Sequence, residues 1–326
     1  MKKRTIACLI GLFVTAGLMV CFIAEAPAAD FPNKNIRIVV GAKPGGGMDT
    51  YARALGRQMG KYLPEGINVV VENRPGAGGR VGASRVYNSE PDGYTLNFPH
   101  MPGLYFPQMF QQETKYDMTK VIWMCLIVRD PRAIAISAKS KYKSLEDLQK
   151  ADDPKFAIVG YTGEAGILLA NATLGVKATY ITGHKNSKEA CLAAIRGDAD
   201  AVGFSYWSIR RFIKSGQLKP VAVLGFEERV SEIPDVPTLS ELGHPKVNSL
   251  LGSFRTICGP PGIPPERVKY LRDIMWKSLN AEEFLAWSKK ANRPVKPMTG
   301  EDTDKLLKKM MAEYINYKDI LGKYIK

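Results

Sequence analysis

The chain has 326 residues, with 46 lysines and arginines against 32 aspartates and glutamates, so its formal net charge is +14. The basic residues are dispersed along the chain, whereas nucleic-acid-binding proteins concentrate them in a patch or stripe. We therefore expect no nucleic-acid partner. An excess of positive charge favours acidic solutes or an anionic surface, although a scattered, solvated charge explains most of it.

The first 28 residues have the pattern of a secretory signal peptide. Lys2, Lys3 and Arg4 precede the apolar stretch 6–24, and Ala26-Pro27-Ala28 fits a cleavage site between small residues. The apolar stretch is long for a signal peptide, so an uncleaved anchor is the alternative, and residues 18–21 only loosely resemble a lipoprotein signal. We expect an exported protein that begins after Ala28, and its remaining length is enough for two modest domains.

Three cysteines remain after that cleavage, namely Cys125, Cys191 and Cys258. They are widely spaced and sit among apolar neighbours, which is the pattern of small core residues and not of a disulfide framework. A single bridge in an oxidising compartment is the alternative.

The first predicted unit is a strand, a glycine-rich turn and a helix. The apolar, β-branched run 36–40 predicts a strand, and the segment 41–49 (GAKPGGGMD) leads into a helical pattern over 49–62. Glycines allow close approach of a ligand to the backbone, and the N–H groups at a helix start favour an anion. The sequence therefore predicts an anion-binding loop here, with an unliganded tight turn as the alternative.

Strands and helices then alternate along the chain. Further strands are predicted at 68–72 and 95–98, with a helix at 79–88 between them, and apolar strands follow at 121–128 and 133–137. A second series begins with a strand at 156–159, a glycine-rich loop at 161–166 and a helix at 166–174. This alternation is typical of an α/β fold, in which ligands lie beyond the carboxyl ends of the strands.

The later part of the chain continues this second series before two long helices close it. Strands are predicted at 178–181, 199–204 and 220–224, with helices at 187–196 and 208–214 between them. Proline-rich passages follow at 233–237 and 260–265, and helices are predicted at 266–279 and 302–317. The passage near Asp235 suits a crossing from the second domain back to the first.

Patterns for catalysis or metal binding are weak. Only His100, His184 and His244 are present, without the spacing of a metal site, and no Gly-x-Ser-x-Gly elbow or phosphate-loop motif occurs. His100 follows a strand and could reach a cleft, or lie in a surface loop. Tyr206 and Trp207 follow another strand end and could wall the cleft, or serve only in packing. We expect no catalytic residues, no metal and no cofactor.

Six motifs occur in order and together resemble one family. They are Phe31–Arg37 (FPNKNIR), Pro44–Asp49 (PGGGMD), Val71–Gly79 (VENRPGAGG), Pro91–Leu96 (PDGYTL), Ile233–Leu239 (IPDVPTL) with Glu241 and Gly243, and Gly259–Pro264 (GPPGIP). This set is similar to that of the solute-binding receptors of tripartite tricarboxylate transporters, also called the Bug family. The resemblance covers nearly all of the chain after residue 30.

The resemblance implies a two-domain periplasmic binding fold of the type II kind, each domain a mixed, mostly parallel sheet flanked by helices, with a ligand cleft between them. It also implies a small carboxylate ligand, no enzymatic activity and a two-component membrane permease as partner. The matching first-domain loop is Pro44, Gly45, Gly46, Gly47, Met48 and Asp49, where the resemblance implies main-chain and water contacts to a carboxylate. For Asp49 we favour bonds to backbone N–H groups at the helix start over a ligand contact.

The second-domain loop departs from the family pattern. It maps onto Gly160, Tyr161, Thr162, Gly163 and Glu164, where the family usually has a serine in the place of Glu164 and a histidine at 167. The family's usual tyrosine is replaced by Gly183, followed by His184 and Lys185. A carboxylate at Glu164 would repel a second ligand carboxylate unless Lys185 or His184 offset it; alternatively Glu164 points to solvent at a helix start, which we favour.

We thus predict domain 1 at 29–128 plus 253–326 and domain 2 at 129–252, with hinge strands near Arg129 and Phe254. The predicted ligand contacts are Pro44, Gly45, Gly46, Gly47, Met48, Asp49, His100, Tyr161, Thr162, Gly163, Glu164, His184, Lys185 and Tyr206. The predicted function is capture of a small organic acid by a monomeric receptor and its delivery to the permease. A sensory adaptor for a membrane kinase and an exported enzyme on the same scaffold are the alternatives.

Overall fold

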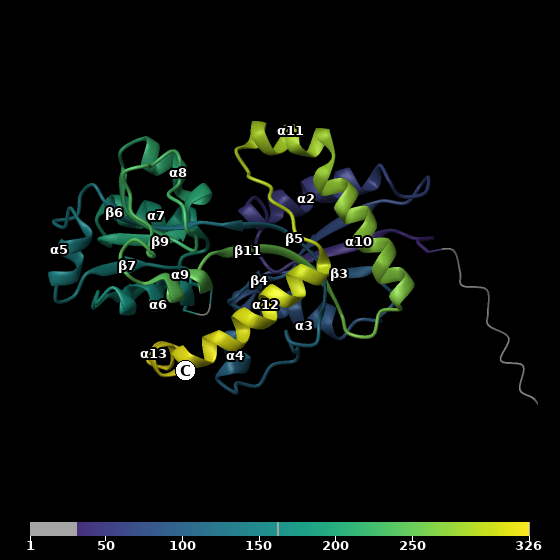
Figure 1. Ribbon diagram of the computed structural model, residues 1–326, viewed down its shortest axis with the longest axis horizontal. Helices are drawn as coiled ribbons and strands as arrows, with labels where there is room; N and C mark the ends of the chain where they lie inside the picture. Colours follow the sequence, from purple (N-terminus) through teal and green to yellow (C-terminus); the bar gives the residue numbers. More distant parts are fainter. Residues whose placement is uncertain (1–30, 162, 326) are drawn as a thin grey trace, which may run out of the picture.

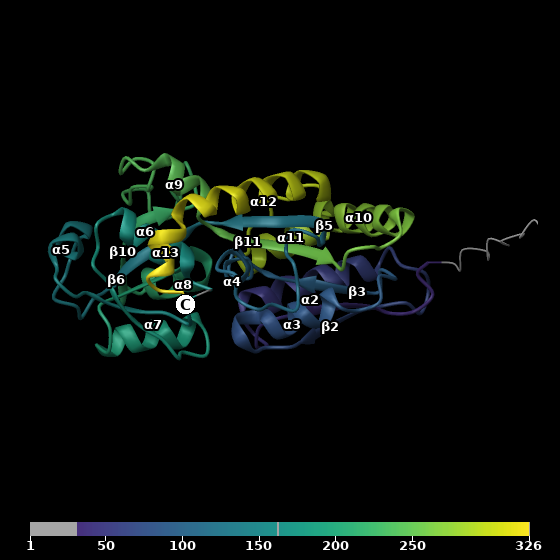
Figure 2. The ribbon, with the colours of Figure 1, turned by 90° about the horizontal axis from the view of Figure 1, so that it is seen from below.

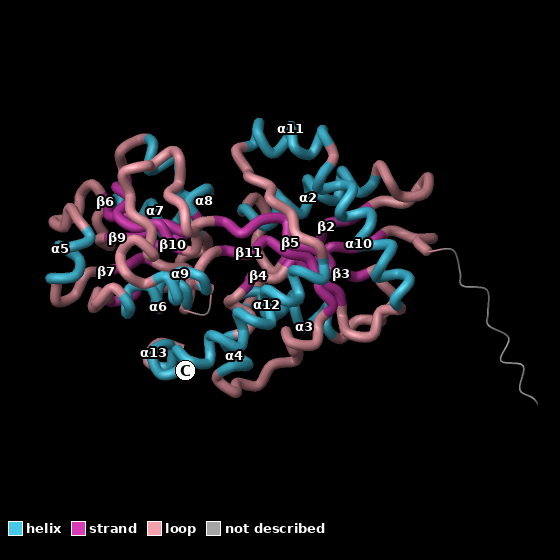
Figure 3. Tube along the Cα trace, in the orientation of Figure 1, coloured by secondary structure: helices cyan, strands magenta, loops and turns pink. Residues whose placement is uncertain are grey.

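The computed structural model describes residues 31–161 and 163–325, so the predicted signal peptide lies outside the described residues. The chain forms two sheets with helices packed around each (Figure 1). Strands β6 to β10 gather in one lobe, and β1 to β3 with α2, α10 and α11 form the other. Figure 3 shows that β5 and β11 run through the region between them. The two-lobed α/β architecture agrees with the expectation.

The first sheet has the order β2-β1-β3-β11-β4, with β5 paired to β11. Its strands are β1 (Ile36–Val40), β2 (Val69–Asn73), β3 (Thr95–Phe98), β4 (His100–Met101), β5 (Ile122–Asp130) and β11 (Ser253–Gly259). Strand β1 pairs in parallel with β2 and β3, while β11 pairs antiparallel with β3, β4 and β5. The sheet is therefore mixed, with more antiparallel pairing than the sequence pattern indicated.

The second sheet has the order β10-β6-β9-β7-β8. Its strands are β6 (Arg132–Ser137), β7 (Lys155–Ala157), β8 (Thr179–Ile181), β9 (Ala201–Ser205) and β10 (Leu218–Leu224). Strand β7 pairs in parallel with β8 and β9, and β6 pairs antiparallel with β9 and β10. The helices of this lobe are α5 (Leu145–Lys150), α6 (Ala165–Thr173), α7 (Ser187–Arg196), α8 (Tyr206–Lys214) and α9 (Pro245–Leu250).

The remaining helices belong mostly to the first lobe. They are α2 (Gly47–Gly60), α3 (Arg80–Tyr87), α4 (Phe106–Met109), α10 (Pro265–Asn280), α11 (Glu282–Ala291), α12 (Gly300–Tyr314) and α13 (Lys318–Gly322), with short 3-10 turns at Ala77–Gly79 and Ile315–Tyr317. The sequence reading missed α4, α9, α11 and α13. None of the helices among the described residues is long and apolar enough to cross a bilayer.

The chain passes between the two sheets at two adjacent places. Only Pro131 separates β5 from β6, and Gly252 lies between α9 and β11. Arg129 ties these crossings together, because its guanidinium donates to the carbonyl oxygens of Ser249 and Leu251 at 2.7 and 2.8 Å. The predicted hinge strands near Arg129 and Phe254 lie beside these crossings, and the hinge itself stays a prediction.

The C-terminal helices reach from the first lobe toward the second. Figure 2 shows α12 lying along β5, with α13 beyond its end beside the second lobe. Helix α13 packs against α6, and the Tyr324 ring meets the Tyr180 ring edge-on at 5.3 Å between centroids. The predicted division into domains at residues 129 and 253 stays a prediction, and the structure adds that the last turn of the chain contacts α6.

The three cysteines of the described residues are buried in the apolar cores. Cys125, Cys191 and Cys258 are buried with free thiols, and burial raises the pKa of Cys125 and Cys191 to about 12. A thiol that resists ionisation among apolar side chains serves as a small core residue. The prediction for these three positions is confirmed.

Candidate functional site

A cavity of about 790 Å³ lies where strand ends of the two sheets meet. Its volume falls within the range of small-molecule pockets, roughly 300–1,000 Å³. From the first lobe it is lined by the loop 41–48, which follows β1, and by His100, which follows β3. From the second lobe it is lined by Gly160, Gly163 and Glu164 and by Ser205 at the end of β9. The placement beyond the strand ends agrees with the expectation for such sheets.

The first-lobe loop is built around the start of α2. Gly46 is the N-cap of this helix, and no side chain caps it, so its first N–H groups remain open toward the cavity. Gly45 has a φ of +81°, which glycine tolerates better than other residues. The predicted loop residues Pro44, Gly45, Gly46, Gly47 and Met48 all line the cavity.

Asp49 stands behind this loop and does not line the cavity. Its carboxylate accepts the Gly45 N–H at 2.9 Å and the Arg53 Nε at 2.9 Å. Burial opposes its ionisation, but the hydrogen bonds from Arg53 and Gly45 outweigh this and hold the pKa of Asp49 below its usual range. Asp49 therefore shapes the loop from within, as the favoured interpretation held.

Two arginines that the sequence reading missed face the start of α2. A Cβ built on Gly47 would lie 3.5 Å from Nη2 of Arg255 and 3.7 Å from Nη1 of Arg293. Arg255 comes from β11, and Arg293 follows α11; both line the cavity. Two guanidinium groups beside one glycine repel each other, and an anion placed between them would relieve the repulsion.

Each arginine is held by the fold. The Nε of Arg255 donates to Asp130 at 2.9 Å, and both side chains are more than nine-tenths buried. The main chain around Arg293 is fixed by its N–H, which donates to the Ser288 carbonyl at 2.9 Å. The segment that follows runs along β5, because the Lys296 N–H donates to the Ile127 carbonyl at 3.0 Å. The Nη1 of Arg293 is buried without a hydrogen-bond partner among the described residues.

The second lobe contributes a buried ion pair to the cavity wall. Glu164 immediately precedes α6 and pairs with Arg132 at the start of β6, and each side chain is about 5% exposed. The favoured interpretation, in which Glu164 points to solvent, is wrong. The offsetting cation is Arg132, and neither Lys185 nor His184 fills that role. An arginine at the start of the otherwise apolar run 132–137 was the one sequence signal that pointed to this pair.

His100 joins the two lobes. A Cβ built on Gly163 would lie 3.1 Å from the His100 ring, so a larger residue there would press against the imidazole. Burial, together with the nearby charges of Arg255 and Arg132, lowers the pKa of His100 to about 3. His100 is therefore a neutral imidazole at physiological pH and contributes hydrogen-bonding capacity without charge.

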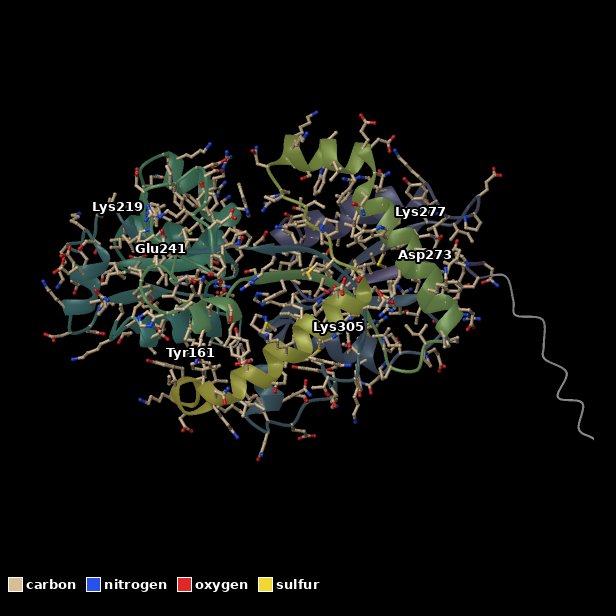
Figure 4. The ribbon with its side chains drawn as sticks, viewed as in Figure 1. Tyr161, Lys219, Glu241, Asp273, Lys277 and Lys305 are labelled. Carbon is tan, nitrogen blue, oxygen red and sulfur yellow. The ribbon has the colours of Figure 1, made fainter. Side chains whose placement is uncertain are left out.

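Three other predicted residues do not line the cavity. Figure 4 labels Tyr161 at the edge of the second lobe, where its ring packs edge-on against Tyr180 at 6.3 Å between centroids. The Tyr206 hydroxyl donates to Glu232 at 2.8 Å within the second lobe. His184 is partly buried outside the lining, whereas its neighbour Lys185 does line the cavity. Thr162 lies outside the described residues.

The described residues offer little for other chemistry. They contain no cluster of three or more His, Cys, Asp or Glu side chains that could hold a metal ion. The cavity lining instead combines open backbone N–H groups, arginines and the hydroxyls of Ser205 and Ser253. Groups of these kinds can hold an oxyanion, since all of them donate hydrogen bonds or carry positive charge.

Comparisons with known proteins agree with this geometry. A family model described as the tripartite tricarboxylate transporter family receptor matches residues 51–321. Protein BugT of Bordetella pertussis is 27% identical over 303 residues, which cover 88% of this chain and 89% of that protein. A solved periplasmic transporter shares 26% identity at a TM-score of 0.77, covering 91% of this chain and 99% of that one.

A second solved structure shares the fold. MatC of Rhodopseudomonas palustris, solved with bound malate, has a TM-score of 0.75 at 23% identity, and the match covers 89% of this chain and 100% of that one. Together with the family match over residues 51–321, these likenesses identify the two-lobed architecture as that of periplasmic binding proteins.

Proposed function

The chain belongs to the tripartite tricarboxylate transporter receptor family, and we propose that it captures a small organic acid in the cavity between its lobes and delivers it to a membrane permease. A family of solute-binding receptors accounts for a site whose described residues combine hydrogen-bond donors with cations. The periplasmic setting of such receptors agrees with the predicted signal peptide, whose removal stays part of the proposal.

One observation carries the proposed acid site, namely the pair of arginines at the uncapped start of α2. The guanidinium groups of Arg255 and Arg293 and the first N–H groups of α2 converge on the surface of Gly47. A carboxylate there would accept hydrogen bonds from the main chain and compensate the charge of Arg293, which has no ion-pair partner among the described residues. Closure of the lobes about the Pro131 and Gly252 crossings would then enclose the acid.

A thermal-shift screen of mono-, di- and tricarboxylates tests the acid site. An acid present at about 100 times its Kd adds roughly 2.7 kcal/mol to the free energy of unfolding. For a chain of this size that corresponds to a rise in Tm of roughly 4 °C. A broad panel at millimolar concentration that leaves the Tm unchanged would contradict the proposal.

Two variants test whether the acid binds beside Gly47. Gly47→Ala places a methyl group in ordinary contact distance of both guanidinium groups, so the protein should fold normally and lose at least tenfold in affinity. Arg293→Met should lose a similar amount, because it removes the cation that has no internal carboxylate. Gly60→Ala, at the far end of α2 with open space around it, and Arg57→Met, an exposed arginine of the same helix, are the matched controls and should bind the acid like the parent.

Delivery to a permease needs a separate measurement. Uptake of the labelled acid by cells that carry the partner permease should depend on this protein, and Gly47→Ala should abolish it. A binding-competent protein that never supports uptake would contradict delivery while leaving the acid site intact. The mass of the exported protein would show whether it begins after Ala28.

A further inference from the structure

Both terminal nitrogens of Arg132, in the ion pair of the second-lobe wall, have protein partners, whereas its Nε is buried without a hydrogen-bond partner among the described residues. Arg132 Nη2 donates to Glu164 and, at 2.8 Å, to the carbonyl of Gly203. Its Nη1 lies 3.4 Å from the Ser253 hydroxyl. Both terminal nitrogens therefore have protein partners, although Arg132 and Glu164 both line the cavity.

Arg255, the other deeply buried arginine of the cavity, is arranged in the opposite way. Its carboxylate partner Asp130 binds Nε, and its terminal nitrogens have no partner among the described residues, with Nη2 directed at Gly47. Two buried arginines thus face one cavity from the two lobes. The first-lobe arginine keeps its terminal nitrogens for a ligand, whereas those of the second-lobe arginine are already used.

Helix capping does not explain the position of the Glu164 side chain. It is the N-cap residue of α6, yet its side chain makes no capping hydrogen bond there. A buried ion pair is a weak source of stability, because the loss of hydration offsets most of the attraction between the charges. At a ligand cavity, the effect of such a pair that matters is the charge that its carboxylate presents to the ligand.

We propose that Glu164 occupies on Arg132 the place that a second ligand carboxylate would take, so that the cavity selects acids with one carboxylate and an uncharged polar second end. This inference rests on the proposed acid site. A second carboxylate at this wall would meet the Glu164 carboxylate where water screens little, and Glu164 already occupies the charge of Arg132 that would attract it. An amide or hydroxyl group meets no such repulsion and can donate a hydrogen bond to Glu164.

The exposed lysines at the cavity rim do not reverse this preference. Lys185 and Lys188 line the cavity but are exposed to solvent, and exposed charges attract an anion only weakly at physiological salt. They raise the rate at which acids of either kind arrive, without providing a fixed second site.

Matched ligands separate the two classes of acid. Isothermal titration with succinate and succinamate, glutarate and glutaramate, and adipate and adipamate compares each diacid with its monoamide at nearly constant shape. We expect the parent protein to bind the best monoamide at least tenfold more tightly than its diacid, a difference of about 1.4 kcal/mol. Glu164→Gln keeps an acceptor for Arg132 and should shift this ratio at least tenfold toward the diacid.

Two further variants complete the test. Glu313→Gln removes an exposed carboxylate from α12 and should leave the ratio within twofold of the parent. Arg132→Met with Glu164→Met removes both charges and should gain less diacid affinity than Glu164→Gln, because no guanidinium is released. If Glu164→Gln fails to fold, the proposal is still tested by the affinity ratio of monoamide to diacid, measured for the parent and for the double variant.

The outcomes separate this inference from the proposed function. A parent protein that binds diacids as tightly as monoamides, or a ratio unmoved by Glu164→Gln, would overturn the selection by Glu164 while leaving the acid site standing. A diacid gain in the double variant equal to that of Glu164→Gln would overturn the role of Arg132. A parent protein that binds none of these acids, nor any of the wider panel, would contradict the proposed function instead.

Discussion

The buried pair of Arg255 and Asp130 gives the sharpest test of how the site is held. Asp130 is 1% exposed, and its Oδ2 accepts from Arg255 Nε at 2.9 Å and from the Ser205 hydroxyl at 3.2 Å. Its Oδ1 has no hydrogen-bond partner among the described residues. Arg255→Met keeps most of the volume and removes the charge, leaving a buried carboxylate with one hydroxyl as partner. Such a loss costs about 3–5 kcal/mol.

Urea denaturation of the ligand-free protein at several pH values measures this cost. The free energy of unfolding at pH 7 should fall by about 3–5 kcal/mol, with a Tm lower by roughly 5–8 °C. Burial disfavours a charged carboxylate whose ion-pair partner has been removed, and protonation in acid removes that charge. The difference between variant and parent should therefore shrink as the pH falls from 7 toward 4.

The double variant Arg255→Met with Asp130→Asn is the control for the buried charge. It should recover most of the loss at pH 7, because no unpaired charge remains, and its difference from the parent should vary little with pH. Arg57→Met should change stability by less than about 0.5 kcal/mol, as expected for an exposed side chain without a specific partner. A loss below 1 kcal/mol for Arg255→Met, or a loss equally large at pH 4 and pH 7, would refute the reasoning.

Three further predictions concern the second lobe and the cavity. Gly203→Ala would bring its methyl group within 2.5–2.7 Å of Ile167 side-chain atoms, so urea denaturation should show a loss of about 1–3 kcal/mol; a neutral result would contradict the tight packing of α6 on β9. Arg210 holds the pKa of Glu232 at about 2, so its stabilisation is full above pH 4.5 and is lost as the pH falls toward 2. Glu232→Gln should accordingly cost about 1 kcal/mol at pH 6, since water screens this partly exposed pair, and the difference should vanish near pH 2. The His100 imidazole should show no NMR titration above pH 4, and a midpoint near 6.5 would contradict its burial.

Local patterns were enough to predict most of the elements that carry the site. The apolar run 36–40 followed by glycines predicted β1 and the open start of α2, and both were found with small shifts in their ends. Such features depend on residues close in sequence, through strand propensity, glycine geometry and helix capping. The ordered motifs also gave the family and the two-lobed fold.

Side chains brought from distant parts of the chain were missed. Arg255 and Arg293 meet beside Gly47 only because β11 enters the first sheet antiparallel and the segment after α11 runs along β5. No short-range pattern specifies either event, since α11 itself was absent from the sequence reading. The pairing of sheet edges is set by tertiary packing, and with it the cations that line the cavity.

Glu164 shows the same division most clearly. By sequence alone, a glutamate before a helix favours a solvated position near the positive end of the helix dipole. The structure instead buries it against Arg132, 32 residues earlier in the chain, because β6 and the loop after β7 meet at the cavity wall. The sequence determined the family, most of the element order and the glycine-rich loop before α2, all of which depend on local chemistry. Only the tertiary structure decided which charges face the cavity, because long-range strand order sets which side chains share one buried, weakly screened space.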